Sequence, residues 1–143
     1  KPIERCKKFF DNLNAKLIYD GGRCFYRPST DEIGMPSIEQ FDNAEEYYSV
    51  FAHEHIHWSE AKHRLDRNKL SYAESELTAE VGAFLTSIFL GITSTPKPNN
   101  LAYLKSWSKG EVNKNKIFSA LSDSSRSLEY LKEQQTKQEK KVA

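Results

Sequence analysis

Two histidines and a glutamate in the middle of the chain have the types and the spacing of a metal-dependent hydrolytic site. They are His53, Glu54 and His57, which form the pattern H-E-x-x-H. On a helix, residues four positions apart lie about 40° apart around the axis and one turn apart along it, so both imidazoles can bind one ion. Glu54 lies beside that face, where its carboxylate can reach a metal-bound water. The pattern therefore predicts hydrolysis by metal-activated water, with Glu54 as the general base.

The other two histidines are expected outside this site. On the same helix His55 would point about 200° away from His53, so it should not bind the same ion. His63 lies outside the spacing of the motif and is more simply a surface residue.

A helix must carry the motif, and the flanking sequence predicts one over residues 43–61. Residues 42–45 have the pattern of a capping box, with Asp42 as the N-cap residue and Glu45 as the third helical residue. No Gly or Pro follows until well beyond the motif. Apolar residues recur at helical spacing and give the helix a side for packing: Tyr47, Tyr48, Phe51 and Trp58.

A catalytic zinc usually has three protein ligands and an open position, so a third ligand should come from a second element. Residues 71–74 form another capping box, and the helix that it opens should end near Leu90, before Gly91. Its apolar stripe consists of Leu77, Val81, Phe84 and Ile88. Glu76 and Glu80 lie one turn apart beside that stripe, where a carboxylate is costly to bury unless a cation pairs with it. Only the spacing favours one of the two as the ligand.

That spacing resembles the zincin metallopeptidases whose third ligand is a glutamate. Residues 58–75 separate the second histidine from Glu76, and residues 76–80 match the E-x-x-A-[DNE] pattern that often follows in those proteins. The resemblance implies Zn²⁺ as the cofactor, a peptide or protein substrate, and Glu76 as the third ligand. It also implies that Glu80 accepts a hydrogen bond that orients a ligand histidine.

A closer resemblance covers most of the chain. The order of several motifs is similar to that in the C-terminal metallopeptidase domain of ArdC-type antirestriction proteins, with Tyr103 and Trp107 similar to that family's next helix. The resemblance implies an α+β fold, mostly helical, with a small antiparallel sheet near the N-terminus, in an antirestriction or mobile-element context. The matching segments are residues 31–36, 47–48, 53–58, 64–67, 72–74 and 76–85.

Two departures from that family bear on function. The family usually continues the zinc helix with Trp-Thr-Gly, whereas this chain has Trp58, Ser59 and Glu60. The family's N-terminal single-stranded-DNA-binding domain has no counterpart in this sequence. Because the formal net charge is only +1, no strong field selects nucleic acid or membranes. Nucleic-acid binding is therefore expected only through a domain outside this sequence.

Two further site roles follow by resemblance. Zincins pair extended peptide substrates with an edge strand beside the metal helix, which makes Ile33, Gly34 and Met35 candidates for that strand. An ordinary loop is an equal alternative. Such proteins also often supply a Tyr or His that donates to the developing oxyanion, which makes Tyr103 a candidate, although a core aromatic is the more common role.

The remaining sequence predicts short elements around the two site helices. Apolar spacing predicts a helix over residues 3–14, and β-rich runs at 15–19 and 23–27 around Asp20, Gly21 and Gly22 predict a hairpin. Further helices are predicted over residues 100–108 and 111–131. We expect one domain over residues 1–131 and a polar tail, disordered or a linker, over residues 132–143.

Composition fits a helix-rich cytoplasmic protein. Hydrophobic residues make up 38% of the 143 residues, and no apolar run is long enough to span a bilayer. Two cysteines make no disulfide framework, so we expect reduced thiols at Cys6 and Cys24. The same sequence also permits a non-enzymatic alternative, in which zinc stabilises an interaction module of an antirestriction or DNA-transfer protein.

Overall fold

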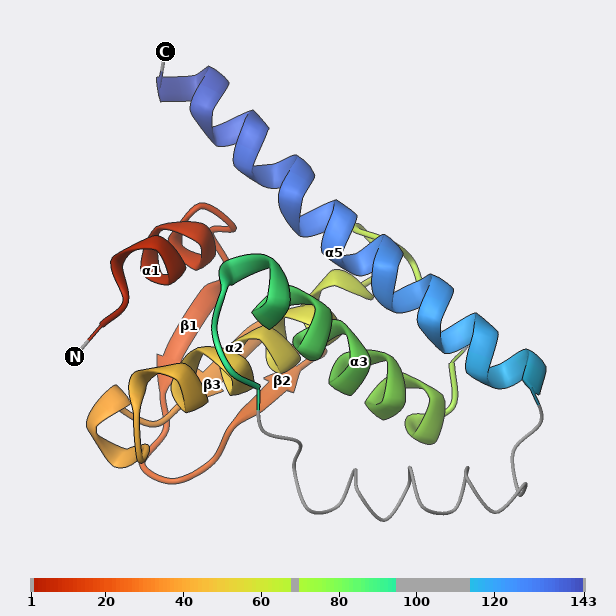
Figure 1. Cartoon of the computed structure of the whole chain (residues 1–143), viewed down its shortest axis with the longest axis horizontal. Helices are drawn as coiled ribbons and strands as arrows, with labels where there is room; N and C mark the ends of the chain where they lie inside the picture. The colour runs from red at the N-terminus through yellow and green to blue at the C-terminus, as the bar shows by residue number, and fades with distance from the viewer. Residues whose placement is uncertain (1, 68–69, 95–113, 143) are drawn as a thin grey trace.

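The computed structural model describes residues 2–67, 70–94 and 114–142, which fold into helices packed beside a small N-terminal sheet (Figure 1). The predicted α+β, mostly helical fold class is confirmed. In chain order the elements are α1 (Glu4–Asp11), β1 (Lys16–Tyr19), β2 (Phe25–Arg27), β3 (Glu32–Met35), a 3₁₀ turn η1 (Ile38–Gln40), α2 (Ala44–Ser59), α3 (Tyr72–Leu90) and α5 (Lys114–Val142).

The sheet is mixed rather than purely antiparallel. Its strand order is β1-β3-β2, with β1 parallel and β2 antiparallel to β3. The predicted hairpin of β1 and β2 is therefore wrong, because β3 lies between the two strands. Asp20 shapes their connection differently, since its carboxylate accepts hydrogen bonds from the backbone N–H groups of Gly22 and Arg23.

The prediction that Ile33, Gly34 and Met35 form a substrate-binding edge strand is also wrong. These residues lie in β3, whose backbone pairs with β1 on one side and β2 on the other. The strand takes the central place because it is the buried one, with Ile33 fully buried and a ring of Phe25 packed against Gly34. The outer edges belong to β1 and β2, so any added strand would have to pair there.

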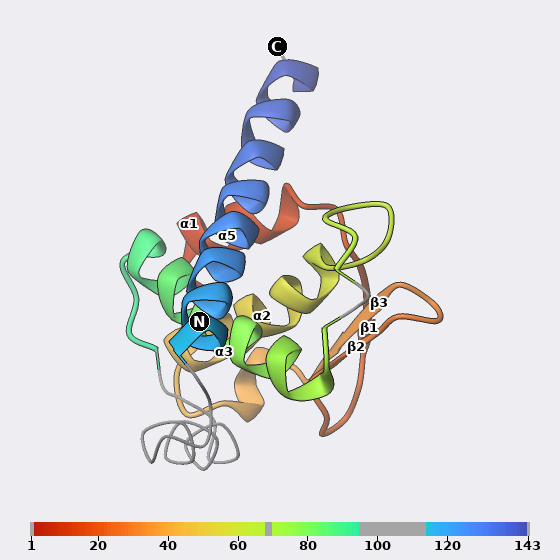
Figure 2. The ribbon, with the colours of Figure 1, turned by 90° about the vertical axis from the view of Figure 1, so that its right-hand side faces the viewer.

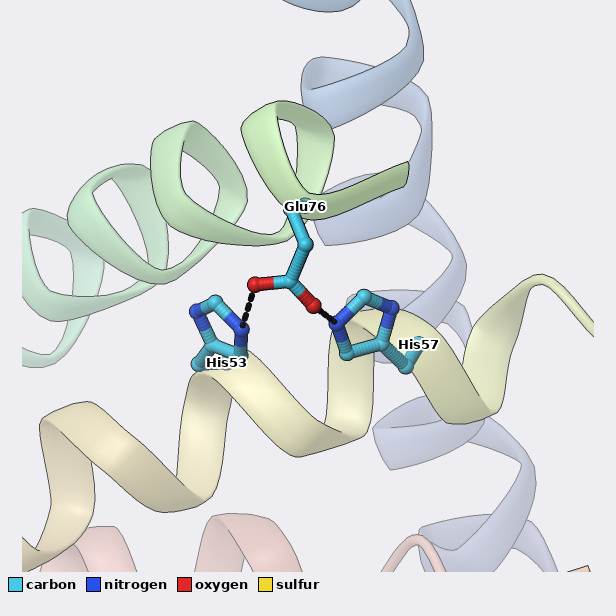
Figure 3. Close-up of side chains that lie close together, drawn as sticks. All are labelled: His53, His57 and Glu76. Carbon is cyan, nitrogen blue, oxygen red and sulfur yellow. Dashed lines mark hydrogen bonds and ion pairs between the residues drawn. The ribbon is translucent and has the colours of Figure 1, made fainter. Parts of the chain in front are cut away.

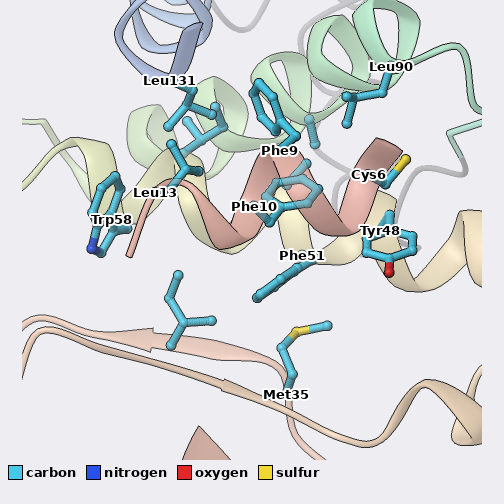
Figure 4. Close-up of a cluster of buried hydrophobic side chains, with 14 of the residues drawn as sticks. Cys6, Phe9, Phe10, Leu13, Met35, Tyr48, Phe51, Trp58, Leu90 and Leu131 are labelled. Atoms are coloured by element: carbon cyan, nitrogen blue, oxygen red, sulfur yellow. The ribbon is translucent and has the colours of Figure 1, made fainter. Parts of the chain in front are cut away.

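A hydrophobic core joins α1, α2, α3, β3 and α5 (Figure 4). Phe10 of α1 lies at its centre, with its ring centroid 6.0 Å from that of Tyr48 and 4.9 Å from that of Phe51 on α2. Met35 of β3 and Leu131 of α5 contribute to the same cluster. This packing fixes the face that α2 turns towards the core.

The face that α3 buries differs from the predicted apolar stripe. Phe84 and Ile88 are 52% and 60% exposed, while the buried positions are mostly small residues. Gly82 explains the difference, because a Cβ atom there would lie only 2.8 Å from Cγ1 of Ile56 on α2. Small residues thus allow α2 and α3 to approach closely, which brings side chains of the two helices together.

The C-terminal residues continue α5 instead of forming a disordered tail. The helix extends through Val142, and its last turns project beyond the rest of the fold (Figures 1 and 2). Gln135 joins it to the body, since its amide donates to the Phe9 carbonyl and accepts from the Asn12 side chain. Among the described helices, none is both long and apolar enough to cross a membrane.

Candidate metal centre

The helix that carries the H-E-x-x-H motif begins one residue later than predicted. Asn43, and not Asp42, is the N-cap residue of α2, and its side-chain oxygen accepts a hydrogen bond from the Glu46 N–H at 2.8 Å. The carboxylate of Glu46 in turn accepts from the backbone N–H of Asp42. Both Asp and Asn are good N-caps, so adjacent residues competed for one position.

The second site helix begins and ends where the sequence predicts. The Ser71 hydroxyl accepts from the Glu74 N–H at 3.1 Å and donates to its carboxylate at 2.9 Å. The helix ends at Leu90 because Gly91 takes the left-handed conformation, with φ of 71°. These two ends set the phase of α3 and therefore the direction in which Glu76 points.

His53, His57 and Glu76 converge between α2 and α3 (Figure 3). The two carboxylate oxygens of Glu76 lie 2.8 Å from Nε2 of His57 and 3.4 Å from Nε2 of His53. One donor atom from each of the three residues lies within 4.8 Å of the others. Two imidazoles and one carboxylate form a donor set that suits zinc and leaves a fourth position for water.

The second nitrogen of each histidine is also held. Nδ1 of His53 lies 3.0 Å from a carboxylate oxygen of Glu80, the position predicted for an orienting acceptor. Nδ1 of His57 lies 3.1 Å from the Ser75 hydroxyl and 3.4 Å from a carboxylate oxygen of Glu60. Sequence reasoning missed Glu60 and Ser75, although Glu60 occupies the position where the chain departs from the family's usual glycine.

The charges of this cluster depend on one another. Burial lowers the pKa of His57, but hydrogen bonds to Glu60 and Glu76 outweigh that effect and raise it to about 9. Burial raises the pKa of Glu76, but hydrogen bonds to His53 and His57 outweigh it and bring that pKa well below the usual range. A cation that binds here must therefore compete with a proton on His57.

Glu54 lies next to His53 on α2 and is only 3% exposed. Its negative charge contributes to the raised pKa of His57, so the carboxylate lies close to the same cluster. It does not belong to the three-residue donor set. That location agrees with the predicted role beside the metal rather than on it.

The other two histidines lie where the sequence predicts. His55 is fully buried on the core side of α2, where Nδ1 donates to the Phe51 carbonyl at 2.9 Å. Nε2 of His55 has no hydrogen-bond partner among the described residues. Burial lowers the pKa of His55 to about 4. His63 is mostly exposed and lies 3.3 Å from Asp31.

A cavity of about 480 Å³ borders the cluster on the side of His57 and Glu60. Tyr26 of β2 and the following Pro28 form one of its walls, so it opens beside an outer edge of the sheet. The loop that follows α2 forms another wall of the cavity, and Arg64 fixes this loop. The Arg64 guanidinium lies 4.0 Å from the Trp58 ring centroid and pairs with Asp31. Tyr103, the predicted oxyanion donor, lies outside the described residues.

Comparison with known families agrees with this geometry. The sequence model of the zincin-like metallopeptidase family matches residues 4–123. Two crystal structures of the antirestriction protein ArdC from plasmid R388 are similar to this chain. The Mn(II)-bound structure has a TM-score of 0.83 and 32% identity, and covers 94% of this chain and 53% of ArdC. The metal-free structure has a TM-score of 0.84 and 31% identity, and covers 96% of this chain and 52% of ArdC.

Curated relatives are longer proteins. An uncharacterized protein, y4eC, of Sinorhizobium fredii (strain NBRC 101917 / NGR234) is 33% identical over 94% of this chain and 46% of its own length. A DNA primase TraC of Escherichia coli is 36% identical over 90% of this chain and 13% of its own length. The chain thus spans less than half of these two curated relatives and about half of ArdC.

Proposed function

This chain belongs to the zincin-like metallopeptidase family, and we propose that it hydrolyses peptide bonds with a zinc ion bound by His53, His57 and Glu76. The observation that carries the proposal is the convergence of one donor atom from each residue within 4.8 Å, between two helices. His53 and His57 offer Nε2, while their Nδ1 atoms are engaged by neighbouring side chains.

The residues fit such an ion. Two nitrogen donors and one carboxylate match the three-ligand composition of catalytic zinc sites, which keep the fourth position open. Hydrogen bonds at both Nδ1 atoms would fix the ring orientations, as is common at metal-bound histidines. When bound, zinc would lower the pKa of its water to about 7 and polarise the substrate carbonyl.

Within this mechanism Glu54 handles the proton. As water attacks the peptide carbonyl, the Glu54 carboxylate takes one proton and then passes it to the leaving amine. Its burial beside His53 keeps bulk water away from this transfer. The cavity bordered by His57, Tyr26 and Pro28 offers room for the substrate next to the cluster. Tyr103 stays a candidate for donation to the oxyanion.

Peptide hydrolysis competes with the non-catalytic alternative, a zinc-stabilised interaction module of an antirestriction or DNA-transfer protein. The relatives favour that alternative, since ArdC is an antirestriction protein and TraC a DNA primase. The metal-free and Mn(II)-bound ArdC structures match this chain equally well, so in that relative the fold does not depend on the ion. An ion that the fold does not need is better explained by chemistry than by stabilisation.

A cleavage assay with zinc-loaded protein tests the proposal. Wild-type protein should cleave unfolded protein substrates or a peptide library, and chelation should abolish this. The Glu54→Gln variant should lose at least about 100-fold in rate while keeping one equivalent of zinc, because it removes the base and no ligand. A matched control, Glu129→Gln, changes an exposed carboxylate of α5 and should retain activity.

Two outcomes would contradict this proposal. Full activity in Glu54→Gln would remove Glu54 as the base. A zinc-loaded wild-type protein that cleaves no candidate substrate, but still binds a partner protein, would favour the interaction module.

A further inference from the structure

We propose that Glu60 and Ser75 act together as a positioning relay that fixes the ring of His57 for metal binding. The inference rests on the proposed metal site and adds two residues that neither the motif nor the family pattern assigns. The relay is defined here as the contact chain from Nδ1 of His57 through the Ser75 hydroxyl to the Glu60 carboxylate.

The distances fix the direction of each hydrogen bond. The Ser75 hydroxyl lies 2.7 Å from Oε1 of Glu60, and since a carboxylate only accepts, the hydroxyl donates its single hydrogen there. Ser75 must then accept from His57, whose Nδ1 lies 3.1 Å from its oxygen. His57 therefore carries a proton on Nδ1, and a bound ion would take the place of the proton that Nε2 donates to Glu76.

Glu60 is poorly explained by fold stability alone. It is only 8% exposed, and its second oxygen, Oε2, has no hydrogen-bond partner among the described residues. A buried carboxylate with an unpartnered oxygen is costly. Glu60 is also the C-cap residue of α2, where a negative charge opposes the helix dipole. The charge of Arg67 attracts that of Glu60 and offsets part of these costs, whereas a neutral side chain at this position would avoid both.

A dication on the other side of His57 would offset them. The negative charge of Glu60 would then lie at the far end of a hydrogen-bonded path from the ion, and would make His57 a stronger ligand. The two histidines would be held in different ways. Glu80 contacts Nδ1 of His53 directly, at 3.0 Å, whereas Glu60 acts on His57 mainly through a hydroxyl from α3.

The test compares metal binding with folding in variants of the full chain. We would measure Zn²⁺ dissociation constants by competition with a chromophoric chelator, the visible spectrum of the Co²⁺-substituted protein, and urea unfolding of the metal-free protein. Ser75→Ala and Glu60→Gln should each weaken Zn²⁺ binding by about 10- to 100-fold and change the Co²⁺ spectrum. Ser75→Thr keeps the hydroxyl and should stay within about 3-fold of wild type.

Ser87→Ala is the matched control, because it removes a buried hydroxyl from the same helix that donates to the Ala83 carbonyl instead. It should leave Zn²⁺ affinity unchanged. If Ser75→Ala and Glu60→Gln bind Zn²⁺ and Co²⁺ as the wild type does and only unfold more easily, the contact is a tie between helices and the relay is wrong. If the wild type itself binds no Zn²⁺, the metal site fails first and the relay fails with it. If Glu60→Gln does not fold, the Zn²⁺ affinities of Ser75→Ala, Ser75→Thr and Ser87→Ala still test the relay.

Discussion

The carboxylate of Glu80 lies 3.0 Å from Nδ1 of His53, while Nε2 of the same ring faces Glu76 at 3.4 Å. The two glutamates, one turn apart on α3, therefore contact opposite sides of one imidazole. Glu76 also reaches His57, and Glu80 is absent from the three-residue donor set. At the proposed metal site the two glutamates would therefore take different roles, Glu76 as a ligand and Glu80 as the acceptor that orients His53.

These two roles predict different losses on substitution. Glu80→Gln should weaken Zn²⁺ binding by about 10- to 100-fold, since it weakens the acceptor that orients His53 but removes no donor atom from the site. Glu76→Gln should weaken it by clearly more, because it replaces a charged ligand. Chelator competition with both variants measures this, and a larger loss in Glu80→Gln would mean that the roles are reversed.

Zinc binding should depend on pH up to unusually high values. In the metal-free protein the pKa of His57 is raised to about 9, so the ring carries two protons at neutral pH and one must leave when an ion binds. The apparent Zn²⁺ affinity should rise about tenfold per pH unit from 7 towards 9 and then level off. Calorimetry at pH 7.5 in two buffers of different ionisation enthalpy should show release of about one proton. No release of a proton would contradict a raised pKa at His57.

His55 should make the metal-free protein sensitive to acid. Its pKa falls from 6.5 to about 4 on folding because the ring is fully buried, so between these values the unfolded state binds a proton more readily. The stabilisation is complete above pH 6.5 and is lost as pH falls through 4, by about 3 kcal/mol in total. Urea unfolding at pH 7 and pH 4.5, in the presence of chelator, measures the loss. His55→Leu should show a smaller difference between the two pH values, whereas the exposed control His63→Gln should behave as wild type.

Gly82 should be needed for the approach of α2 to α3. Gly82→Ala places a Cβ 2.8 Å from Cγ1 of Ile56, a branched side chain that has little freedom to move. We expect the clash to outweigh the better helix propensity of Ala and to lower the free energy of unfolding by about 1 to 2 kcal/mol. The same substitution made in an Ile56→Ala background, which removes Cγ1 and the other contacting carbons, should be less harmful, and a double-mutant cycle in urea would detect this. A more stable Gly82→Ala protein would show that the interface between α2 and α3 has room for a methyl group at this position.

The three-residue donor set could be anticipated because its signals are local. His53 and His57 lie within one turn of a single helix, and the Ser71 cap sets the phase of α3 so that Glu76 turns towards them. Helix bounds followed from capping residues and from Gly91. The error at Asn43 arose because its neighbour Asp42 is an equally good N-cap, and local sequence does not choose between them.

The features that could not be anticipated depend on contacts between distant segments. The hairpin signal at Asp20 was overridden by β3, whose buried residues pair with both other strands. Small residues on α3 proved to be the buried ones, and one of them, Gly82, lies against Ile56 of α2, a contact that helical periodicity alone does not reveal. Glu60 lies at the end of α2 and Ser75 lies on α3, and the sequence alone does not show that both side chains contact His57.

Three of the four histidines occupy successive odd positions of α2, yet they are held in three different chemical settings. The imidazole of His55 is buried among aromatic rings, that of His53 contacts one carboxylate at each nitrogen, and that of His57 contacts a hydroxyl and two carboxylates. Their ring protons should consequently resonate apart in a nuclear magnetic resonance spectrum. One titration of a single sample with Zn²⁺ could then follow the integrity of the protein interior and the occupancy of the metal cluster as separate signals.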